Sequence, residues 1–208
     1  MQILFGGTFD PVHSGHVAMI EALSAAFPEA TVHVIPNRLP PHRQSVASST
    51  DRLKMLEMVL ARFPSVVVNR IELDRDGPSY TRDTLLLFRD QFGAQESLVL
   101  ALGADAAAGL SRWHHPEEIA TLAHVCVLDR EGRSAILPPV MDALKEIDRA
   151  DMLQNVPFGH LLRLKTPVIR VSSTAVREKL MRGETDLPVP DEISEYIHTH
   201  RLYRTPND

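Results

Sequence analysis

Residues 6–16 combine glycines, two histidines and a predicted helix start, a combination suited to binding an anion. Gly6 and Gly7 let the backbone turn sharply and approach a ligand closely. A helix that begins directly afterwards offers unpaired N–H groups and the positive end of its dipole. His13 and His16 lie about one turn apart, so their ring N–H donors can address the same phosphate. The segment predicts a phosphate site, with a plain tight turn as the open alternative.

The two histidines are also compatible with half of a metal site, because imidazole is a common zinc ligand. No carboxylate or cysteine at a diagnostic spacing completes such a set, so we expect no metal ligands from the protein. The segment contains neither the G-x-G-x-x-G fingerprint nor the G-x-x-x-x-G-K-[ST] loop. A hydride-transferring Rossmann enzyme and a P-loop ATPase are therefore both disfavoured.

Residues 172–174 place three hydroxyl side chains at the start of another predicted helix. One hydroxyl suffices as an N-cap, and a cap is the simplest interpretation of the segment. Arg177 follows about one turn later, so hydroxyls, free N–H groups and a guanidinium gather at one helix end. Two anion sites at one sheet edge favour a polyphosphate ligand.

Strands and helices are expected to alternate along the chain. The expected strands are 2–5, 31–35, 66–68 with Ile71 and Leu73 continuing it, 98–102, 125–128 and 161–164. The expected helices are 14–27, one capped at 50–51, one through residues 85–88, one from about 173 and one after Pro190. This order predicts a Rossmann-like, doubly wound α/β fold, with a mostly parallel sheet and helices on both faces. Ligands bind beyond the carboxyl ends of such strands, where both anion segments are expected.

Residues 37–49 show little periodicity and contain two prolines, which predicts a loop before the helix capped at 50–51. The apolar residues of that helix follow helical spacing and predict its buried face: Leu53, Leu56, Leu60 and Phe63.

The composition is that of an ordinary globular protein and predicts a single domain, residues 1–208, with C-terminal helices packed onto it. A single cysteine, Cys126, excludes an internal disulfide framework. The net charge of −5 disfavours a non-specific nucleic-acid coat. We find neither a secretion signal nor an apolar run near the roughly 18 residues of a membrane span, and expect a cytoplasmic protein. A homo-oligomer remains open.

Residues 7–16, GTFDPVHSGH, resemble the G-T-F-D-P-x-H-x-G-H signature of the nucleotidyltransferase superfamily, and we call them the first motif. Residues 172–177, SSTAVR, are similar to its S-S-T-x-[IV]-R signature and are the second motif. Within the superfamily, residues 36–43, 78–85 and 102–113 resemble bacterial nicotinate-nucleotide adenylyltransferases. The similarity covers nearly the whole chain.

This resemblance implies an enzyme that transfers an adenylyl group from ATP to nicotinate mononucleotide. The products would be pyrophosphate and nicotinate adenine dinucleotide, a precursor of NAD. No protein nucleophile is required, so catalysis would consist of alignment and of charge neutralisation on phosphate oxygens. Mg²⁺, bound mainly through the ATP phosphates, would share that work.

The resemblance assigns catalysis to His16, His13 and Arg177, with His16 nearest the transferred group. In the 36–43 loop, many relatives have lysine where this sequence has Pro41, so the basic pair here would be the next two residues. The ATP-binding set further includes Gly7, Thr8, Phe9, His42, Arg43, Ser172, Ser173 and Thr174.

The mononucleotide is expected at a second group of residues. Trp113, the only tryptophan, would stack on the pyridine ring, although a core position is the plainer interpretation. Thr81 and the backbone at His114 would contact the nicotinate carboxylate. Asp105 would accept from ribose hydroxyls, with a helix N-cap as its alternative, and Arg130 would assist with phosphate.

Several alternative functions remain open. A nicotinamide-mononucleotide adenylyltransferase would differ only in an uncharged amide on the substrate. Pantetheine-phosphate adenylyltransferase is usually shorter and carries threonine where this chain has His13. Cytidylyltransferases share G-T-F-D but lack the 78–85 stretch. A non-catalytic nucleotide-binding module would keep the fold, and the two intact motifs disfavour it.

Overall fold

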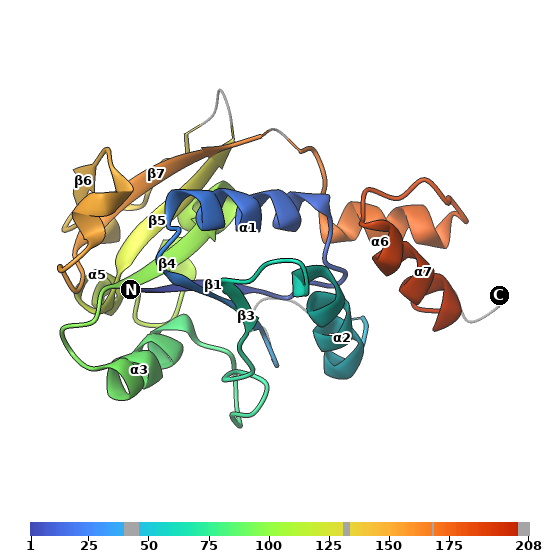
Figure 1. Ribbon diagram of the computed structural model, residues 1–208, viewed down its shortest axis with the longest axis horizontal. Helices are drawn as coiled ribbons and strands as arrows, with labels where there is room; N and C mark the ends of the chain where they lie inside the picture. The colour runs from blue at the N-terminus through green and yellow to red at the C-terminus, as the bar shows by residue number, and fades with distance from the viewer. Residues whose placement is uncertain (40–45, 131–133, 168, 204–208) are drawn as a thin grey trace.

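The computed structural model describes residues 1–39, 46–130, 134–167 and 169–203, and its centre is a parallel sheet (Figure 1). The strands are β1 (Gln2–Gly7), β2 (Thr31–Pro36), β3 (Val66–Val68), β4 (Leu98–Gly103), β5 (His124–Arg130), β6 (Lys145–Ile147) and β7 (His160–Thr166). Their spatial order is β3-β2-β1-β4-β5-β7-β6, and each neighbouring pair is parallel.

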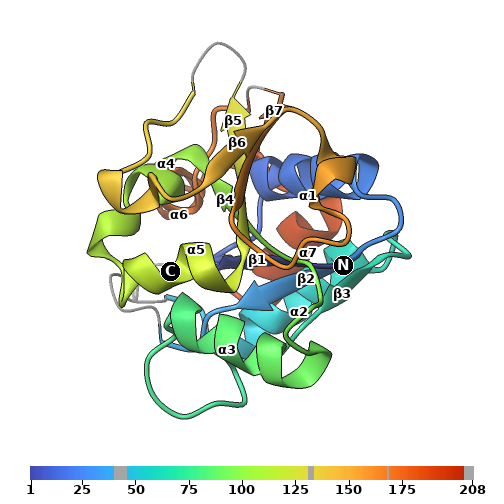
Figure 2. The ribbon, with the colours of Figure 1, turned by 90° about the vertical axis from the view of Figure 1, so that its left-hand side faces the viewer.

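Helices cover both faces of this sheet (Figures 1 and 2). They are α1 (Ser14–Ala26), α2 (Ser49–Leu60), α3 (Thr81–Phe92), α4 (Ala104–Ala108), α5 (Pro116–Leu122), α6 (Ser173–Met181) and α7 (Asp191–Thr199). Three 3₁₀-helices are η1 (Leu110–Arg112), η2 (Pro139–Met141) and η3 (Ala150–Leu153). The doubly wound α/β fold expected from the sequence is confirmed.

Alternate residues of β1 point to opposite faces and enter two separate hydrophobic cores. Ile3 and Phe5 join α1, α2, α6 and α7 in one core. Leu4 joins α3, α4 and α5 in the other. The sheet is therefore buried on both faces, which explains why its central strands are continuous apolar runs.

Helix α1 follows from its sequence as expected. Val17, Ile20 and Leu23 recur at helical spacing, and all three are buried against the sheet. Phe27 is the C-cap, and its side chain is buried in the same core. This packing holds the N-terminus of α1 directly after the first strand.

The expected start of α2 is wrong. Ser48 is the N-cap, and its hydroxyl accepts from the N–H of Asp51 at 3.1 Å. The helix therefore begins before the expected cap at 50–51. Its buried face includes Arg52, whereas Leu53 is only half-buried.

The expected continuation of β3 through Ile71 and Leu73 is also wrong. The strand ends at Val68, and the Asn69 side-chain oxygen accepts from the N–H of Ile71 at 3.0 Å. A local bond of this kind replaces a sheet hydrogen bond with a turn. Strand β6 and helix α5 were not predicted from the sequence.

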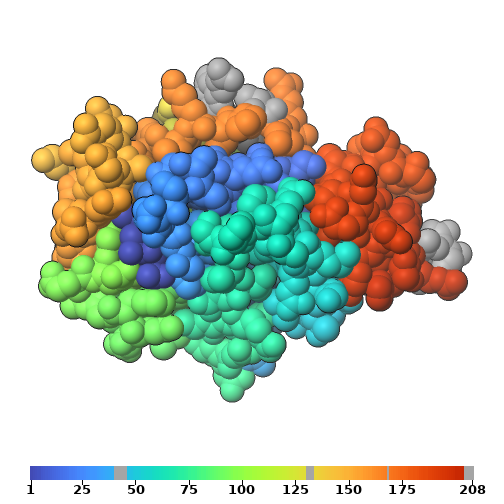
Figure 3. Space-filling view, in the orientation of Figure 1, coloured from blue at the N-terminus to red at the C-terminus, as the bar shows by residue number. Residues whose placement is uncertain are grey.

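The chain winds from β1 to β2 and β3, then continues with β4 on the other side of β1. Ligands in open parallel sheets bind beyond the strand ends at this change of direction. Gly7 and Gly103 end the two strands that flank it. Helices α6 and α7, in red, lie at one end of the molecule, where α7 packs against α2 (Figure 3).

None of the helices in the described parts of the chain combines the length and the apolar composition needed to cross a lipid bilayer.

Candidate active site

A cavity of about 590 Å³ opens beyond the carboxyl ends of β1 and β4. Its walls include His13 and His16 of the first motif and Ser172 and Ser173 of the second. The two motifs are far apart in sequence, and the fold brings them to one crevice. Its volume falls within the range of small-molecule sites.

Most of the residues expected at the site line this cavity, and others do not. Thr174 and Arg177 are not among its lining residues. His42 and Arg43 lie outside the described residues, and only the backbone of Arg130, at the end of β5, is described. The expected residues that line the cavity are Gly7, Thr8, Phe9, His13, His16, Thr81, Asp105, Trp113, His114, Ser172 and Ser173.

His13 and His16 cap the start of α1 reciprocally. The Nδ1 atom of His13 accepts from the N–H of His16, and the Nδ1 atom of His16 accepts from the N–H of His13, both at 3.3 Å. The rings stack with centroids 3.7 Å apart. Because each Nδ1 is an acceptor, the proton of each neutral ring belongs on Nε2. This reciprocal pair of bonds, a capping box, thus selects the tautomer in which Nε2–H is the donor.

Burial lowers the pKa of His16 well below its usual value, and the nearby His13 lowers it further. His16 is therefore a neutral hydrogen-bond donor at pH 7 in the ligand-free protein. A neutral donor with a fixed direction suits the stabilisation of charge on a phosphoryl oxygen.

The turn between β1 and α1 depends on Phe9, which has a left-handed φ of 51° and is buried. Its ring makes edge contacts with Phe5 and His16. A Cβ atom on Gly7 would lie 2.9 Å from this ring, so only glycine fits there without a shift. The glycine therefore leaves room for Phe9 to pack against His16.

The first two hydroxyls of the second motif have structural partners. The Ser172 hydroxyl accepts from the N–H of Ala175 at 3.1 Å and is the N-cap of α6. The Ser173 hydroxyl donates to the carbonyl of Pro11 at 3.0 Å. The N-cap interpretation therefore holds for Ser172, while Ser173 ties α6 to the first motif.

Arg177 also contacts the first motif. Its Nη1 donates to the carbonyl of Asp10 at 2.6 Å, and its Nη2 donates to the Thr174 hydroxyl at 3.3 Å. The guanidinium therefore supports the backbone of the phosphate segment from behind the cavity lining.

Asp10 of the first motif has a structural role that its sequence pattern did not predict. Only 2% of the residue is exposed, and it does not line the cavity. Its carboxylate accepts from the N–H groups of Val46 and Ala47 at 2.7 and 3.1 Å, and from the Tyr203 hydroxyl at 2.7 Å. These bonds join the first motif to the segment before α2 and to the end of the described chain.

Arg52 of α2 is buried beside this carboxylate, with 1% of the residue exposed. Its Nη1 donates to the carbonyl of Thr8 at 2.7 Å, and its Nη2 donates to the carbonyl of Asn37 at 2.8 Å. Burial lowers the pKa of Arg52, and the nearby carboxylate of Asp10 opposes that effect. Arg52 therefore ties together the segments that follow β1 and β2.

Residues 80–81 and 113–114 form the other end of the cavity, which we call the acceptor end. The Tyr80 and His114 rings stack with centroids 4.2 Å apart. Tyr80 is the N-cap of α3 without a side-chain cap, so the first N–H groups of α3 have no capping side chain. Trp113 is half-buried, lines the cavity and also packs against the second core.

Asp105 lies in the first turn of α4 at the cavity edge. The N-cap of α4 is Gly103, so the alternative interpretation of Asp105 as an N-cap is wrong. An exposed carboxylate at this rim can accept from hydroxyl groups of a ligand.

Glu72 is a buried carboxylate in the cavity wall that the sequence analysis did not identify, and 4% of it is exposed. It accepts from the Thr84 hydroxyl at 2.7 Å and from the Asn37 amide at 2.8 Å. These bonds connect the end of β2 with the first turn of α3.

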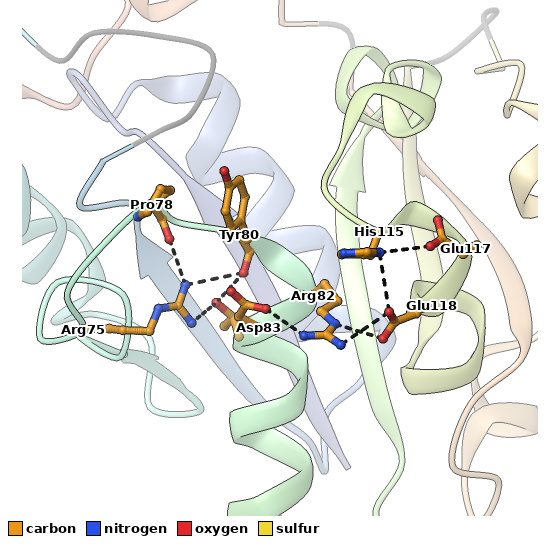
Figure 4. A network of polar contacts seen from close by, with 9 residues as sticks. Arg75, Pro78, Tyr80, Arg82, Asp83, His115, Glu117 and Glu118 are labelled. Carbon is orange, nitrogen blue, oxygen red and sulfur yellow. Dashed lines mark hydrogen bonds and ion pairs between the residues drawn. The ribbon is translucent and has the colours of Figure 1, made fainter.

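A network of ion pairs lies behind the acceptor end (Figure 4). Arg82 of α3 contacts Glu118 of α5, and His115 contacts Glu117 and Glu118. His115, Glu117 and Glu118 are also the only described side chains grouped closely enough to share a metal ion. They do not line the cavity, and Arg82 already neutralises Glu118.

The sequence matches the Cytidylyltransferase-like family over residues 4–179. A Chromohalobacter salexigens protein named Probable nicotinate-nucleotide adenylyltransferase is 37% identical over 206 residues, covering 96% of this chain and 94% of that protein. A Cellvibrio japonicus protein of the same name is 38% identical over 207 residues, covering 97% of each chain. The chain belongs to the nicotinate-nucleotide adenylyltransferase family. The resemblance inferred from the motifs is thus confirmed.

Solved structures with names from this family share the fold. The Plasmodium falciparum nicotinic acid mononucleotide adenylyltransferase complexed with APC aligns with a TM-score of 0.74 at 17% identity, over 97% of this chain and 96% of that one. The same enzyme complexed with NaAD aligns with a TM-score of 0.72 at 15% identity, over 97% and 96%. At such low sequence identity, these two structures show that the fold is shared, and nothing more.

Proposed function

We propose that this chain transfers the adenylyl group of ATP to nicotinate mononucleotide, forming nicotinate adenine dinucleotide and pyrophosphate. The observation that carries this proposal is the single cavity lined by both motifs and by the acceptor end. Membership in the nicotinate-nucleotide adenylyltransferase family supports the choice of substrates.

In this reaction, a phosphate oxygen of the mononucleotide forms a bond to the α-phosphorus of ATP, and the bond from that phosphorus to the pyrophosphate oxygen breaks. His16 and His13 direct Nε2–H donors at the oxygens on which charge develops. The only cysteine, Cys126, is buried in β5, and burial raises the pKa of its thiol. The chain thus supplies position and hydrogen bonds, and no nucleophile.

In this proposal, the second motif helps to bind the phosphates of ATP. Ser172 and Ser173, at the N-terminus of α6, belong to the cavity lining. Arg177 and Thr174 act on the same phosphates only if their bonds rearrange when ATP binds. His42, Arg43 and Arg130 remain candidates for the outer phosphates.

The acceptor end binds the nicotinate ring. Trp113 offers a planar face, and the first N–H groups of α3, at Thr81, offer donors to the carboxylate. His114 completes this wall, and Asp105 accepts from ribose hydroxyls. A nicotinamide substrate lacks the negative charge that the helix terminus favours, so we expect weaker binding of the amide.

The donor set suits Mg²⁺ carried by the triphosphate. His13 and His16 present nitrogen atoms, and the carboxylate of Asp10, which is not part of the lining, already accepts three hydrogen bonds. Mg²⁺ prefers oxygen ligands and is often held through substrate phosphates, where it neutralises developing charge. The protein residues would therefore bind phosphate oxygens that the ion leaves accessible.

The remaining expectations stay predictions. They are a single domain over residues 1–208, a cytoplasmic location, a possible homo-oligomer, and no nucleic-acid or membrane partner.

The test of the proposed function is pyrophosphate release by the purified full chain with ATP, Mg²⁺ and one acceptor at a time. The acceptors are nicotinate mononucleotide, nicotinamide mononucleotide and pantetheine phosphate, with CTP replacing ATP in a parallel series. We expect the highest kcat/KM with ATP and nicotinate mononucleotide. A preference for another pair identifies a different transferase, and no release with any pair identifies a binding module.

A further inference from the structure

We propose that Arg82 and Glu118 are positioning residues for the acceptor mononucleotide, because their ion pair sets the distance between the two walls of the acceptor end. This inference rests on the proposed function. Neither residue lines the cavity, and neither belongs to the two motifs.

The pair is a two-point contact between α3 and α5 (Figure 4). Arg82 Nε lies 2.9 Å from Glu118 Oε2, and Arg82 Nη2 lies 3.4 Å from Glu118 Oε1. A planar guanidinium that meets both carboxylate oxygens restricts orientation as well as distance. Replacement of either residue removes this restriction on distance and orientation.

Each partner is linked to one wall of the acceptor end. Arg82 directly follows Thr81, which lines the cavity at the start of α3. Glu118 lies 3.7 Å from the ring of His115, which directly follows His114 of the opposite wall. His115 has a left-handed φ of 48°, a conformation that a non-glycine residue keeps only with support from its surroundings.

The opposite ends of α3 and α5 are fastened independently. Arg89, near the end of α3, donates from Nε and Nη2 to the carbonyl of Leu122, the last residue of α5, at 2.9 and 2.6 Å. With those ends fixed, the Arg82–Glu118 pair governs the separation of the helix starts. The rings of Tyr80 and His114, one from each wall, stack on each other, so a change in that separation shifts the surface that faces the ligand.

The side chains of Arg82 and Glu118 are 30% and 36% exposed, so the pair contributes little to overall stability. Its effect on binding is larger than its effect on folding, because small misplacements at a reacting site are costly. We expect the mononucleotide to lose about fivefold in affinity, and ATP to be unaffected.

The experiment compares Arg82→Gln, Glu118→Gln and the double variant with the unaltered chain. The KM for nicotinate mononucleotide at saturating ATP should rise about fivefold in each single variant, with the KM for ATP within about twofold. The double variant should be less impaired than the sum of the single variants, because the Arg82–Glu118 pair is lost in all three, whereas the contacts of Arg82 with Asp83 and of Glu118 with His115 are lost separately. Quenching of the single tryptophan, Trp113, by the mononucleotide should shift to higher concentration in parallel.

The matched control is Arg149→Gln, which breaks the exposed pair with Asp151 away from the cavity lining. It should leave both KM values and the Trp113 titration unchanged. An unchanged mononucleotide KM in Arg82→Gln, equal losses for both substrates, or additive effects in the double variant would overturn the positioning role. An unaltered chain without turnover would overturn the proposed function itself, and this inference with it.

Discussion

The two ends of the cavity are held by different kinds of interaction. The phosphate end, formed by the two motifs, rests on buried charges: Asp10 and Arg52 are 2% and 1% exposed. The acceptor end rests on the stacked rings of Tyr80 and His114 and on the half-exposed pair of Arg82 and Glu118.

This difference has a physical consequence. Hydrogen bonds to buried charges are strong, directional and costly to break, so the phosphate end is held in one geometry. Partly exposed ion pairs are weak and screened by salt, so the acceptor end can adjust at low cost. Transferring a phosphoryl-type group needs donors at fixed positions, whereas a misplaced acceptor raises its own KM and leaves those donors in place.

Loss of His16 should have the largest effect. We expect His16→Ala to lower kcat by about a hundredfold or more, because a preorganised donor to the reacting phosphate is removed. Initial rates of pyrophosphate release at saturating substrates measure the change. His16→Gln keeps an acceptor for the capping box and should recover thermal stability without recovering turnover. Turnover near normal in His16→Ala would remove this residue from the mechanism.

Asp10→Asn should have the next largest effect, and this effect should be on the stability of the fold. The amide replaces one carboxylate oxygen with an N–H donor, which then faces either the donor of Val46 at Oδ2 or the donors of Ala47 and Tyr203 at Oδ1. We expect the free energy of unfolding in urea to fall by about 2–3 kcal/mol. Asp76→Asn, at a fully exposed carboxylate paired with Arg38, is the control and should change stability little. Equal stability of both variants would contradict the rigid phosphate end.

Trp113→Ala should give a moderate and selective effect. Loss of the aromatic face should raise the KM for nicotinate mononucleotide about tenfold and leave the KM for ATP nearly unchanged. Because Trp113 also packs against the second core, circular dichroism should accompany the kinetics. If both KM values rise equally, the main role of Trp113 is structural, in the second core.

The smallest expected change concerns pH. Burial, with help from His13, lowers the pKa of His16, so the folded ring stays neutral where an ordinary histidine takes up a proton. The unfolded chain then binds more protons below about pH 6.5, and this group's contribution to stability is lost as pH falls from there. Ring NMR shifts of His16 should stay constant from pH 8 to about pH 6. In urea they should titrate near 6.5, and the same titration in the folded protein would contradict the assignment.

The first motif was largely predictable from local chemistry. Glycine at residue 7, histidines one turn apart and the apolar spacing of α1 all act over short distances, so sequence alone reveals them. The fold class followed in the same way, since each strand and helix carries its own periodicity. The start of α2 was less accessible, because a capping serine at 48 competed with a capping pair at 50–51.

The supporting residues were not predictable from patterns. Arg52 lies on a helix face that hydrophobic spacing assigns to apolar residues, and only its contacts with Thr8 and Asn37 explain its burial. Glu72 and Tyr203 carry no motif. Their importance depends on partners brought close by the fold.

The amino-acid order by itself determined the two motifs, the parallel α/β architecture and the family, because these depend on residues close together along the chain. Only the tertiary structure decided which charges are buried, that Asp10 meets Tyr203, and that Arg82 meets Glu118. The physical reason is that burial and ion pairing depend on distances in space. Those distances arise when strands and helices pack, and no local pattern encodes them.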